Sequence, residues 1–450
     1  MLSMELIATI TLLVLMLLIF CGIHLINALM LSSVIGIFLT TGNINIAMNL
    51  LANTAWGAIR DYIFGVIPLF ILMGLFANLS GASQELYDGA RLVFKRIRGG
   101  VGVATVAANA VFSCITGVSV AAVTVFTKIA YPQMTRLGYD KRLTLGVISG
   151  SGVLGMLIPP SLMMIVYGVQ AGESIGRLFL AGVIPGIVLA IFFCIVILLF
   201  GKVNPKAIPP AEPLTEEEKK GFWKVVLRPW PVGLLIALSL GGIWAGFFTP
   251  TEGAGVGALG ALLLVFAKRK FTLRSFWDTL LSAGTTTGTV LFLLISAQMY
   301  SRSLAISGIV GHIQNIVLGL DIPVMVIILS FMVIFIFIAL FIDSTSCLLL
   351  TIPLMAPIMR DLGVDLVWFG LCAIVAIQTG LITPPFGMNV FTVKAALHGL
   401  PGSESVVLSD IFAGSVPFFL AMLVLIALML AFPPLVLFLP NLVSAALAGG

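Results

Sequence analysis

The chain has 450 residues, of which 60% are hydrophobic and only 9% are charged, and its mean hydropathy is +1.20. No soluble domain has this composition, so the sequence predicts a polytopic membrane protein. The net charge of +5 does not indicate nucleic-acid binding, because the basic residues lie between apolar segments, where they set topology. All five cysteines lie inside apolar stretches and predict buried thiols rather than a disulfide or metal framework: Cys21, Cys114, Cys194, Cys347 and Cys372.

Apolar runs of roughly 20 residues predict membrane-spanning helices. In chain order they are 4–20, 24–40, 60–78, 178–200, 231–248, 253–267, 279–300 and 411–432. The first run lacks the basic start and the A-x-A site of a signal peptide, which favours a retained span over a cleaved one. Residues 44–56 predict an amphipathic arm along the membrane interface, and residues 303–320 predict a similar arm before the second hairpin.

Two apolar stretches, 101–131 and 323–358, carry a polar tip near their middle. The tips have the sequences TGVS at 116–119 and DSTS at 343–346. Each stretch is long enough for two half-membrane helices, and we interpret both as re-entrant hairpins. The alternatives are one long span, or two ordinary spans joined by a tight loop.

The positive-inside rule favours the re-entrant interpretation. With the N-terminus outside, it puts most of the 23 Lys and Arg residues in the cytoplasm, whereas a full crossing would place 91–98 and 136–142 on opposite faces. The first hairpin then opens from inside and the second from outside, so the halves are inverted repeats. Residues 202–230 predict a cytoplasmic linker, helical around 215–223.

One short motif occurs twice, as GMLIPP at 155–160 and GLITPP at 380–385, at an offset of 225 residues. Proline has no N–H and crowds the carbonyl four residues earlier, so each double proline predicts a broken helix. The segments are 143–172 and 366–396. We expect free carbonyls at Gly155, Met156, Gly380 and Leu381. Paired broken helices point to a transporter binding site.

Asp343 is the acidic residue that lies deep inside an apolar run. An intramembrane carboxylate is costly and indicates function, here cation coupling in preference to a purely structural helix cap, although the two roles are compatible. The tip hydroxyls of both halves, with Thr383, suit a hard cation such as sodium. Asn109 and Asn389 are polar residues in apolar helices, and packing is the commoner role of such residues.

Other signals are structural or negative. Glu252 predicts a capping box with Thr249. The isolated histidines form no metal pattern, and the P-loop, H-E-x-x-H and G-x-S-x-G motifs are all missing from the sequence. These observations argue against an enzyme.

Several stretches together resemble the large membrane (DctM-like) subunit of TRAP transporters, the tripartite ATP-independent periplasmic family. They are VIPLFILMG at 66–74, RLGYD at 136–140, LGMLIPPS at 154–161, LFLAGVIPG at 178–186, FTPTE at 248–252 and GLITPPFG at 380–387. The chain departs from the family pattern at Val118, where serine is frequent, and at Ser344, where glycine is usual.

The resemblance implies sodium-driven uptake of organic acids such as dicarboxylates or sialic acid across the bacterial inner membrane, where the charge distribution predicts a periplasmic N-terminus. It implies two partners, a small four-helix membrane subunit and a periplasmic binding protein, and an elevator motion. Sodium sites would lie between each tip and its loop, at Ser119, Gly155, Met156, Asp343, Thr345, Gly380, Leu381 and Thr383. Substrate would bind between the tips, with candidates Ser119, Thr116, Asn109, Ser161, Thr383 and Asn389. The alternative is an autonomous ion-coupled anion transporter or antiporter.

The predicted fold is therefore all-α, with two inverted repeats that each hold a re-entrant hairpin and a broken helix. We divide the chain into N-terminal scaffold helices (1–100), the first hairpin, broken helix and following span (101–200), and the linker (201–230). The second-half scaffold (231–320) and the second hairpin, broken helix and last span (321–450) complete the chain.

Overall fold

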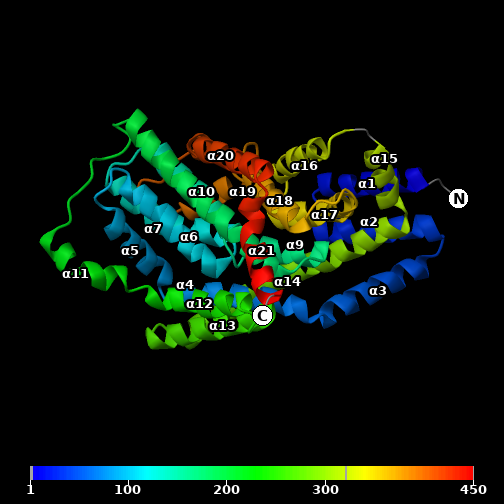
Figure 1. Ribbon diagram of the computed structural model, residues 1–450, viewed down its shortest axis with the longest axis horizontal. Helices are drawn as coiled ribbons and strands as arrows, with labels where there is room; N and C mark the ends of the chain where they lie inside the picture. Colours follow the sequence, from blue (N-terminus) through cyan, green and yellow to red (C-terminus); the bar gives the residue numbers. More distant parts are fainter. Residues whose placement is uncertain (1–3, 320–321, 449–450) are drawn as a thin grey trace.

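The computed structural model describes residues 4–319 and 322–448, and within them every regular element is a helix. Figure 1 shows the helices of both halves in one body, with α9, α17 and α18 near the middle of the view. The chain begins at one end of this body and finishes near its middle. The predicted all-α polytopic class is confirmed.

The two halves share one register along nearly the whole chain. α2 (Leu25–Thr41), α7 (Ser119–Arg136) and α8 (Lys141–Gly152) begin 225 residues before α13 (Pro250–Ala267), α17 (Ser344–Asp361) and α18 (Leu366–Gly380). The remaining pairs are α1 (Met4–Phe20) with α12 (Trp230–Trp244), α5 (Ala82–Phe94) with α15 (Ile309–Gly319), α6 (Gly100–Thr116) with α16 (Val324–Ala339), α9 (Leu162–Ala171) with α19 (Met388–Ala396), and α10 (Ile175–Val203) with α20 (Leu408–Ala431).

The two predicted arms, residues 44–56 and 303–320, do not correspond at this offset, and residue 320 lies outside the described residues. Residues 44–56 belong to α3 (Ile44–Arg60), which is followed by η1 (Tyr62–Gly65) and α4 (Val66–Leu79). At the same offset these three elements match the single helix α14 (Leu273–Ile306). α3 ends because Asp61 is extended and its carboxylate accepts the Ile63 N–H, which starts a new turn. The counterpart of α15 is therefore α5.

Six helical segments within the described residues are long and apolar enough to cross a membrane. They are Tyr62–Leu79, Ile175–Val203, Glu216–Trp244, Pro250–Ala267, Leu273–Ile306 and Leu408–Ala431. The first two predicted spans, α1 and α2, have 17 residues each, about 25 Å of helix. A further helix that the sequence did not predict, α21 (Pro434–Ala448), follows the last span and packs on α10.

Each predicted hairpin is a pair of helices with a break at the predicted tip. α6 and α7 have 17 and 18 residues, and α16 and α17 have 16 and 18. The break excludes one long span. The arms are each about 25 Å long, which exceeds half of a hydrocarbon core of about 30 Å. They are longer than predicted because the second arms run on to Arg136 and Asp361.

The linker helix α11 (Glu216–Val226) confirms the predicted helical stretch. Thr215 and Glu218 close its N-terminus as a capping box, and Thr249 and Glu252 do the same for α13, as predicted. All five cysteines are free. Cys347 and Cys372 are buried, but Cys21 is exposed because it lies beyond the end of α1, and Cys114 and Cys194 are half-buried.

The ion pairs of Glu85 join α5 to two other segments. Its carboxylate, on a side chain only 10% exposed, binds the Lys268 ammonium at the end of α13 and lies 3.0 Å from the Arg228 guanidinium at the end of the linker. Breaking a pair this buried leaves an uncompensated charge. α5 is thus fixed to α13 of the second half and to the end of the linker.

The two broken helices form the centre of the protein. Every residue of α18 is buried, and α8 is buried from Leu143 to Gly152. Glycines let α8 approach α20 closely: an added Cβ on Gly146 would lie 1.9 Å from the Gly414 carbonyl oxygen. Backbone thus packs on backbone at this crossing.

We expect Gly146→Ala to destabilise the folded protein by about 1–3 kcal/mol or more, because the methyl group overpacks the α8–α20 contact. The matched control is Gly284→Ala on α14, where an added Cβ meets nothing within 4 Å. That change should be neutral or stabilising by up to about 1 kcal/mol through helix propensity. Thermal unfolding in detergent measures both, and equal midpoints for the two variants would contradict the packing argument.

Candidate functional site

The first hairpin tip is a two-residue turn built on glycine. Gly117 ends α6 with a positive φ of 62°, and its N–H donates to the Ser113 carbonyl over 3.2 Å. Val118 is extended, and Ser119 opens α7. Only glycine adopts the left-handed conformation without strain. The turn therefore places the N-terminus of α7 at the predicted tip, with Gly117 and Ser119 both buried.

The first tip rests directly on the first double-proline loop. The Leu162 N–H donates to the Gly117 carbonyl over 3.0 Å. An added Cβ on Gly117 would lie 2.6 Å from the Pro160 carbonyl oxygen, and one on Gly155 would lie 3.1 Å from that of Val118. The structure thus brings together Ser119 and the loop of Gly155 and Met156, as predicted. The proline pair of this loop is joined by a cis peptide bond, as is that of the second loop.

The expected free carbonyl of Met156 has a partner. It accepts a hydrogen bond from the Ser161 hydroxyl over 2.5 Å, and the same hydroxyl accepts the Met164 N–H and so caps α9. Ser161, a predicted substrate residue, therefore closes the broken helix. A carbonyl oxygen has two lone pairs, so Met156 retains one for a ligand.

A side-chain bridge joins the two halves at the first tip. Ser119 and Asn389 exchange hydrogen bonds of 2.9 and 3.1 Å between the hydroxyl and the amide, and both side chains are fully buried. The Asn389 N–H donates to the Leu381 carbonyl over 3.1 Å, so this expected free carbonyl also has a partner. Asn389 thereby connects the tip of one half to the broken helix of the other.

Two other predicted substrate residues are held in packing contacts. The Asn109 amide donates to the Ser151 hydroxyl over 3.0 Å, while its Oδ1 is buried and has no hydrogen-bond partner among the described residues. The Thr116 hydroxyl donates to the Phe112 carbonyl of its own helix, and its backbone packs against Gly74 of α4. Thr116 ends α6 at the first tip, whereas Asn109 lies about two turns earlier in the same helix.

Asp343 caps the second hairpin helix. It is half-buried and extended, and its carboxylate accepts the Ser346 N–H over 3.0 Å and the Ser346 hydroxyl. The structural cap that the sequence allowed is confirmed. These two bonds use part of the carboxylate's capacity, so the remaining lone pairs stay available to a cation.

The second double-proline loop differs from the first in exposure. Pro384, Pro385 and Phe386 are exposed, whereas the whole first loop, 151–161, is buried. Thr383 donates through its hydroxyl to the Thr379 carbonyl and through its N–H to the Gly380 carbonyl, which leaves neither Gly380 nor Leu381 with the free carbonyl we predicted.

The second tip reaches its loop through different residues than predicted. An added Cβ on Gly380 would lie 2.7 Å from the Ile336 carbonyl oxygen of α16, and the Phe341 and Phe386 rings pack with centroids 6.0 Å apart. Thr345 is buried at the start of α17.

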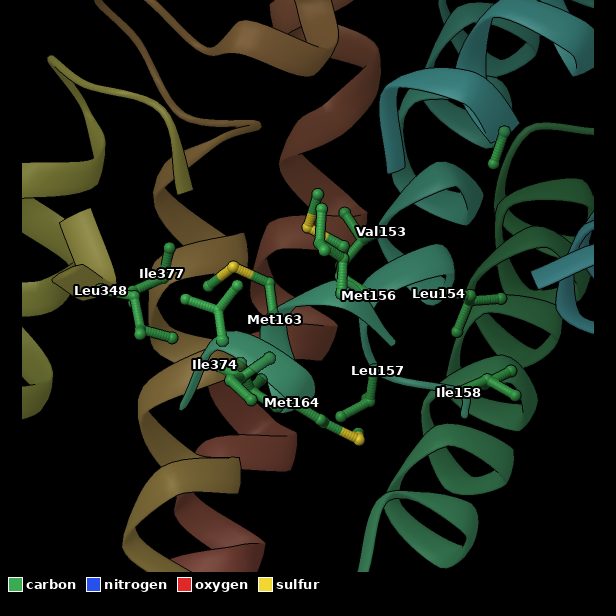
Figure 2. Close-up of a cluster of buried hydrophobic side chains, with 14 of the residues drawn as sticks. Val153, Leu154, Met156, Leu157, Ile158, Met163, Met164, Leu348, Ile374 and Ile377 are labelled. Atoms are coloured by element: carbon green, nitrogen blue, oxygen red, sulfur yellow. The ribbon is translucent and has the colours of Figure 1, made fainter. Parts of the chain in front are cut away.

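Sequence reasoning missed the contact of Met156 with the second half. Its sulfur lies 2.7 Å from the Gln378 amide nitrogen and 3.5 Å from the Ser344 hydroxyl. Gln378 is fully buried, and its Oε1 has no hydrogen-bond partner within the described chain. Figure 2 shows Met156 beside Val153 in an apolar cluster, with Met163 between it and Leu348 and Ile377 of the second half. The sequence did carry a signal for this contact, because Gln378 is an amide side chain near the end of the mostly apolar α18.

The site therefore offers hydroxyls, backbone groups, amides and one half-buried carboxylate. Within residues 4–319 and 322–448 no group of three or more His, Cys, Asp or Glu could hold a metal ion. The N-termini of α7, α9 and α19 are linked through the Gly117, Ser119 and Asn389 contacts. Helix N-termini carry partial positive charge and bind anions. The arrangement suits an anionic ligand beside a hard cation.

The family model described as "Tripartite ATP-independent periplasmic transporter, DctM component" matches residues 12–435. The chain belongs to this family. It is thus a TRAP large membrane subunit, a multi-pass transporter component and not an enzyme.

Relatives of this large subunit include transporters of several substrates. It is 32% identical over 386 residues to the C4-dicarboxylate TRAP transporter large permease protein DctM of Pseudomonas aeruginosa, covering 85% of this chain and 87% of that protein. It is 29% identical to the ectoine permease TeaC of Halomonas elongata, covering 91% and 93%. It is 28% identical to the sialic acid permease SiaT of Haemophilus influenzae, covering 84% of this chain and 59% of that protein.

A solved structure supports the transporter fold of this TRAP subunit. The YdaH transporter of Alcanivorax borkumensis superposes with a TM-score of 0.63 at 14% identity, over 87% of this chain and 89% of that one. At this identity the likeness concerns the fold alone.

We expect Ser119→Ala to destabilise the protein by about 1–3 kcal/mol, because it leaves the buried Asn389 amide without its partner. Ser415→Ala is the matched control: it also removes a fully buried hydroxyl, but one that donates only to the Ile411 carbonyl of its own helix. Thermal unfolding of the two variants provides the comparison. Equal losses would mean that the bridge between the halves contributes nothing of its own.

Proposed function

We propose that this chain performs sodium-coupled uptake of an organic acid, a carboxylate, across the bacterial inner membrane. The observation that carries the proposal is the linkage of three helix N-termini, those of α7, α9 and α19, around Ser119 and Asn389. Such N-termini favour a carboxylate. Relatives named for C4-dicarboxylates and sialic acid support this substrate class.

Sodium would bind at two places. The first set is Ser119 with the Gly155 and Met156 carbonyls, which the tip contact holds together. The second set is Asp343 and Thr345 with Gly380, Leu381 and Thr383, whose loop is the more exposed of the two. Hydroxyl, carbonyl and carboxylate oxygens are the donors that hard cations prefer.

Substrate would lie between the tips, against Ser119, Asn389 and Thr383. The remaining candidates support this arrangement: Ser161 closes the loop, Asn109 joins α6 to α8, and the Thr116 hydroxyl bonds within α6. Sodium would order the tips, and the ordered form would bind the anion, so that each ligand raises affinity for the other.

The membrane arrangement is part of the proposal. Both hairpins are re-entrant, the repeats are inverted, the N-terminus is periplasmic, and a domain of hairpins and broken helices moves as an elevator against the remaining helices. The distribution of Lys and Arg supports this topology. A small four-helix membrane subunit and a periplasmic binding protein complete the system.

We expect uptake into proteoliposomes that contain this chain and its small subunit to require both a sodium gradient and the binding protein. The test compares uptake with and without each, using radiolabelled C4-dicarboxylates and sialic acid. Uptake undiminished without the binding protein would establish the autonomous transporter or antiporter instead. Uptake independent of sodium would refute the coupling.

Asp343→Asn should raise the sodium concentration for half-maximal uptake about tenfold or more, because the lost charge weakens a cation contact. The control is Asp365→Asn, since Asp365 also caps a helix, α18, by accepting the Val367 and Trp368 N–H groups. The control should keep the normal sodium dependence. Unchanged sodium activation in Asp343→Asn would mean that this residue only caps its helix and does not take part in sodium coupling.

A further inference from the structure

The linker helix α11 lies beside α5, with a groove on either side of it. One groove is lined by acidic and basic residues together: Glu85, Asp88, Arg91, Leu92, Glu217, Glu218, Gly221, Val225 and Arg228. The other is lined by Leu92, Val93, Arg96, Leu214, Lys219, Phe222 and Trp223. We call the second one the α5–α11 groove. Its charged lining residues are both cations.

The cations of the α5–α11 groove are free to bind an anion. Arg96 is exposed and makes no ion pair within the described chain, unlike its neighbour Lys95, which binds Glu218 over 2.7 Å. Lys219 pairs with Glu216 one turn earlier, but both side chains are well exposed, and such pairs contribute little. A ligand phosphate can therefore replace Glu216 at small cost.

The wall of the groove is apolar and exposed. Trp223 is 68% exposed and Val93 is 45% exposed, although both sit among charged residues. Nearby, Leu227 and Trp230 are 57% and 65% exposed, and α12 starts at Trp230. Tryptophan beside charges at the start of a candidate span is typical of the lipid headgroup level.

We propose that the α5–α11 groove binds an anionic phospholipid, with the phosphate between Arg96 and Lys219 and an acyl chain along Val93 and Trp223. Charge complementarity selects the anion, and the apolar wall selects a lipid over a soluble phosphate. The site is separate from the transport site, so the proposal does not depend on the proposed substrate or coupling ion.

The test uses the full chain with its small subunit in nanodiscs that contain phosphatidylcholine and phosphatidylglycerol. One of the two lipids carries dibrominated acyl chains, which quench nearby tryptophan. The signal of Trp223 is the difference between the wild type and Trp223→Phe. We expect stronger quenching by brominated phosphatidylglycerol than by brominated phosphatidylcholine at equal mole fraction.

Arg96→Gln and Lys219→Gln should each lower the relative affinity for phosphatidylglycerol about fivefold, in line with the usual contribution of one basic residue at an anionic surface. Lys220→Gln is the matched control, because Lys220 lies on the same helix and does not line the groove. Both groove cations are exposed, so the folded protein and its thermal midpoint should be retained.

Equal quenching by the two lipids, or a preference that survives the double variant, would overturn the proposal. Added inorganic phosphate should leave the quenching unchanged. If it abolishes the preference for phosphatidylglycerol, the groove is a soluble-anion site and the lipid proposal fails.

Discussion

A helix that loses its own hydrogen bonds inside an apolar core must find other partners, and this constraint organises the centre of the protein. The first double proline frees backbone groups that Ser161 and the Gly117 tip then satisfy. The second frees groups that Thr383 and Asn389 satisfy. The Asn389 side chain also binds Ser119, so one residue both bonds the broken helix of its own half and contacts the hairpin of the other half. Site and core are thus built from the same contacts.

The halves are equal in register and unequal in environment. The first loop is buried against its tip, whereas Pro384, Pro385 and Phe386 of the second are exposed. The two motifs indicate this difference at one position, where the second has Thr383 and the first has Ile158. Met156 fills the space toward Gln378 and Ser344, so a ligand that reaches this contact has to displace a flexible thioether rather than rigid backbone.

Features set by local chemistry were predictable from the sequence. The internal repeat, the two broken helices, the tip positions, the Asp343 cap and both capping boxes are set by residues close together in the chain. The two arms do not correspond in register, because residues 44–56 belong to a segment that matches α14, whereas α15 matches α5. The Ser119–Asn389 bridge joins residues 270 apart, and the Gln378–Met156 contact joins residues 222 apart. No local pattern encodes such distances. The prediction of free carbonyls failed for another reason, because nearby residues of the same segment donate to them: Ser161 to Met156, Thr383 to Gly380 and Asn389 to Leu381.

The anchoring of α5 by Glu85 has a mechanical consequence. Gly81, with a φ of 86°, precedes this helix, and Gly99, with a φ of 85°, lies beyond its end at Phe94 and directly before α6. The Glu85 carboxylate is fixed to Lys268 and Arg228. Glu85 lies in the first turn of α5, so the helix is held near its N-terminal end. Any shift of the first hairpin relative to α13 would therefore be taken up as torsion at Gly99. In such a shift α5 would move together with the end of the linker.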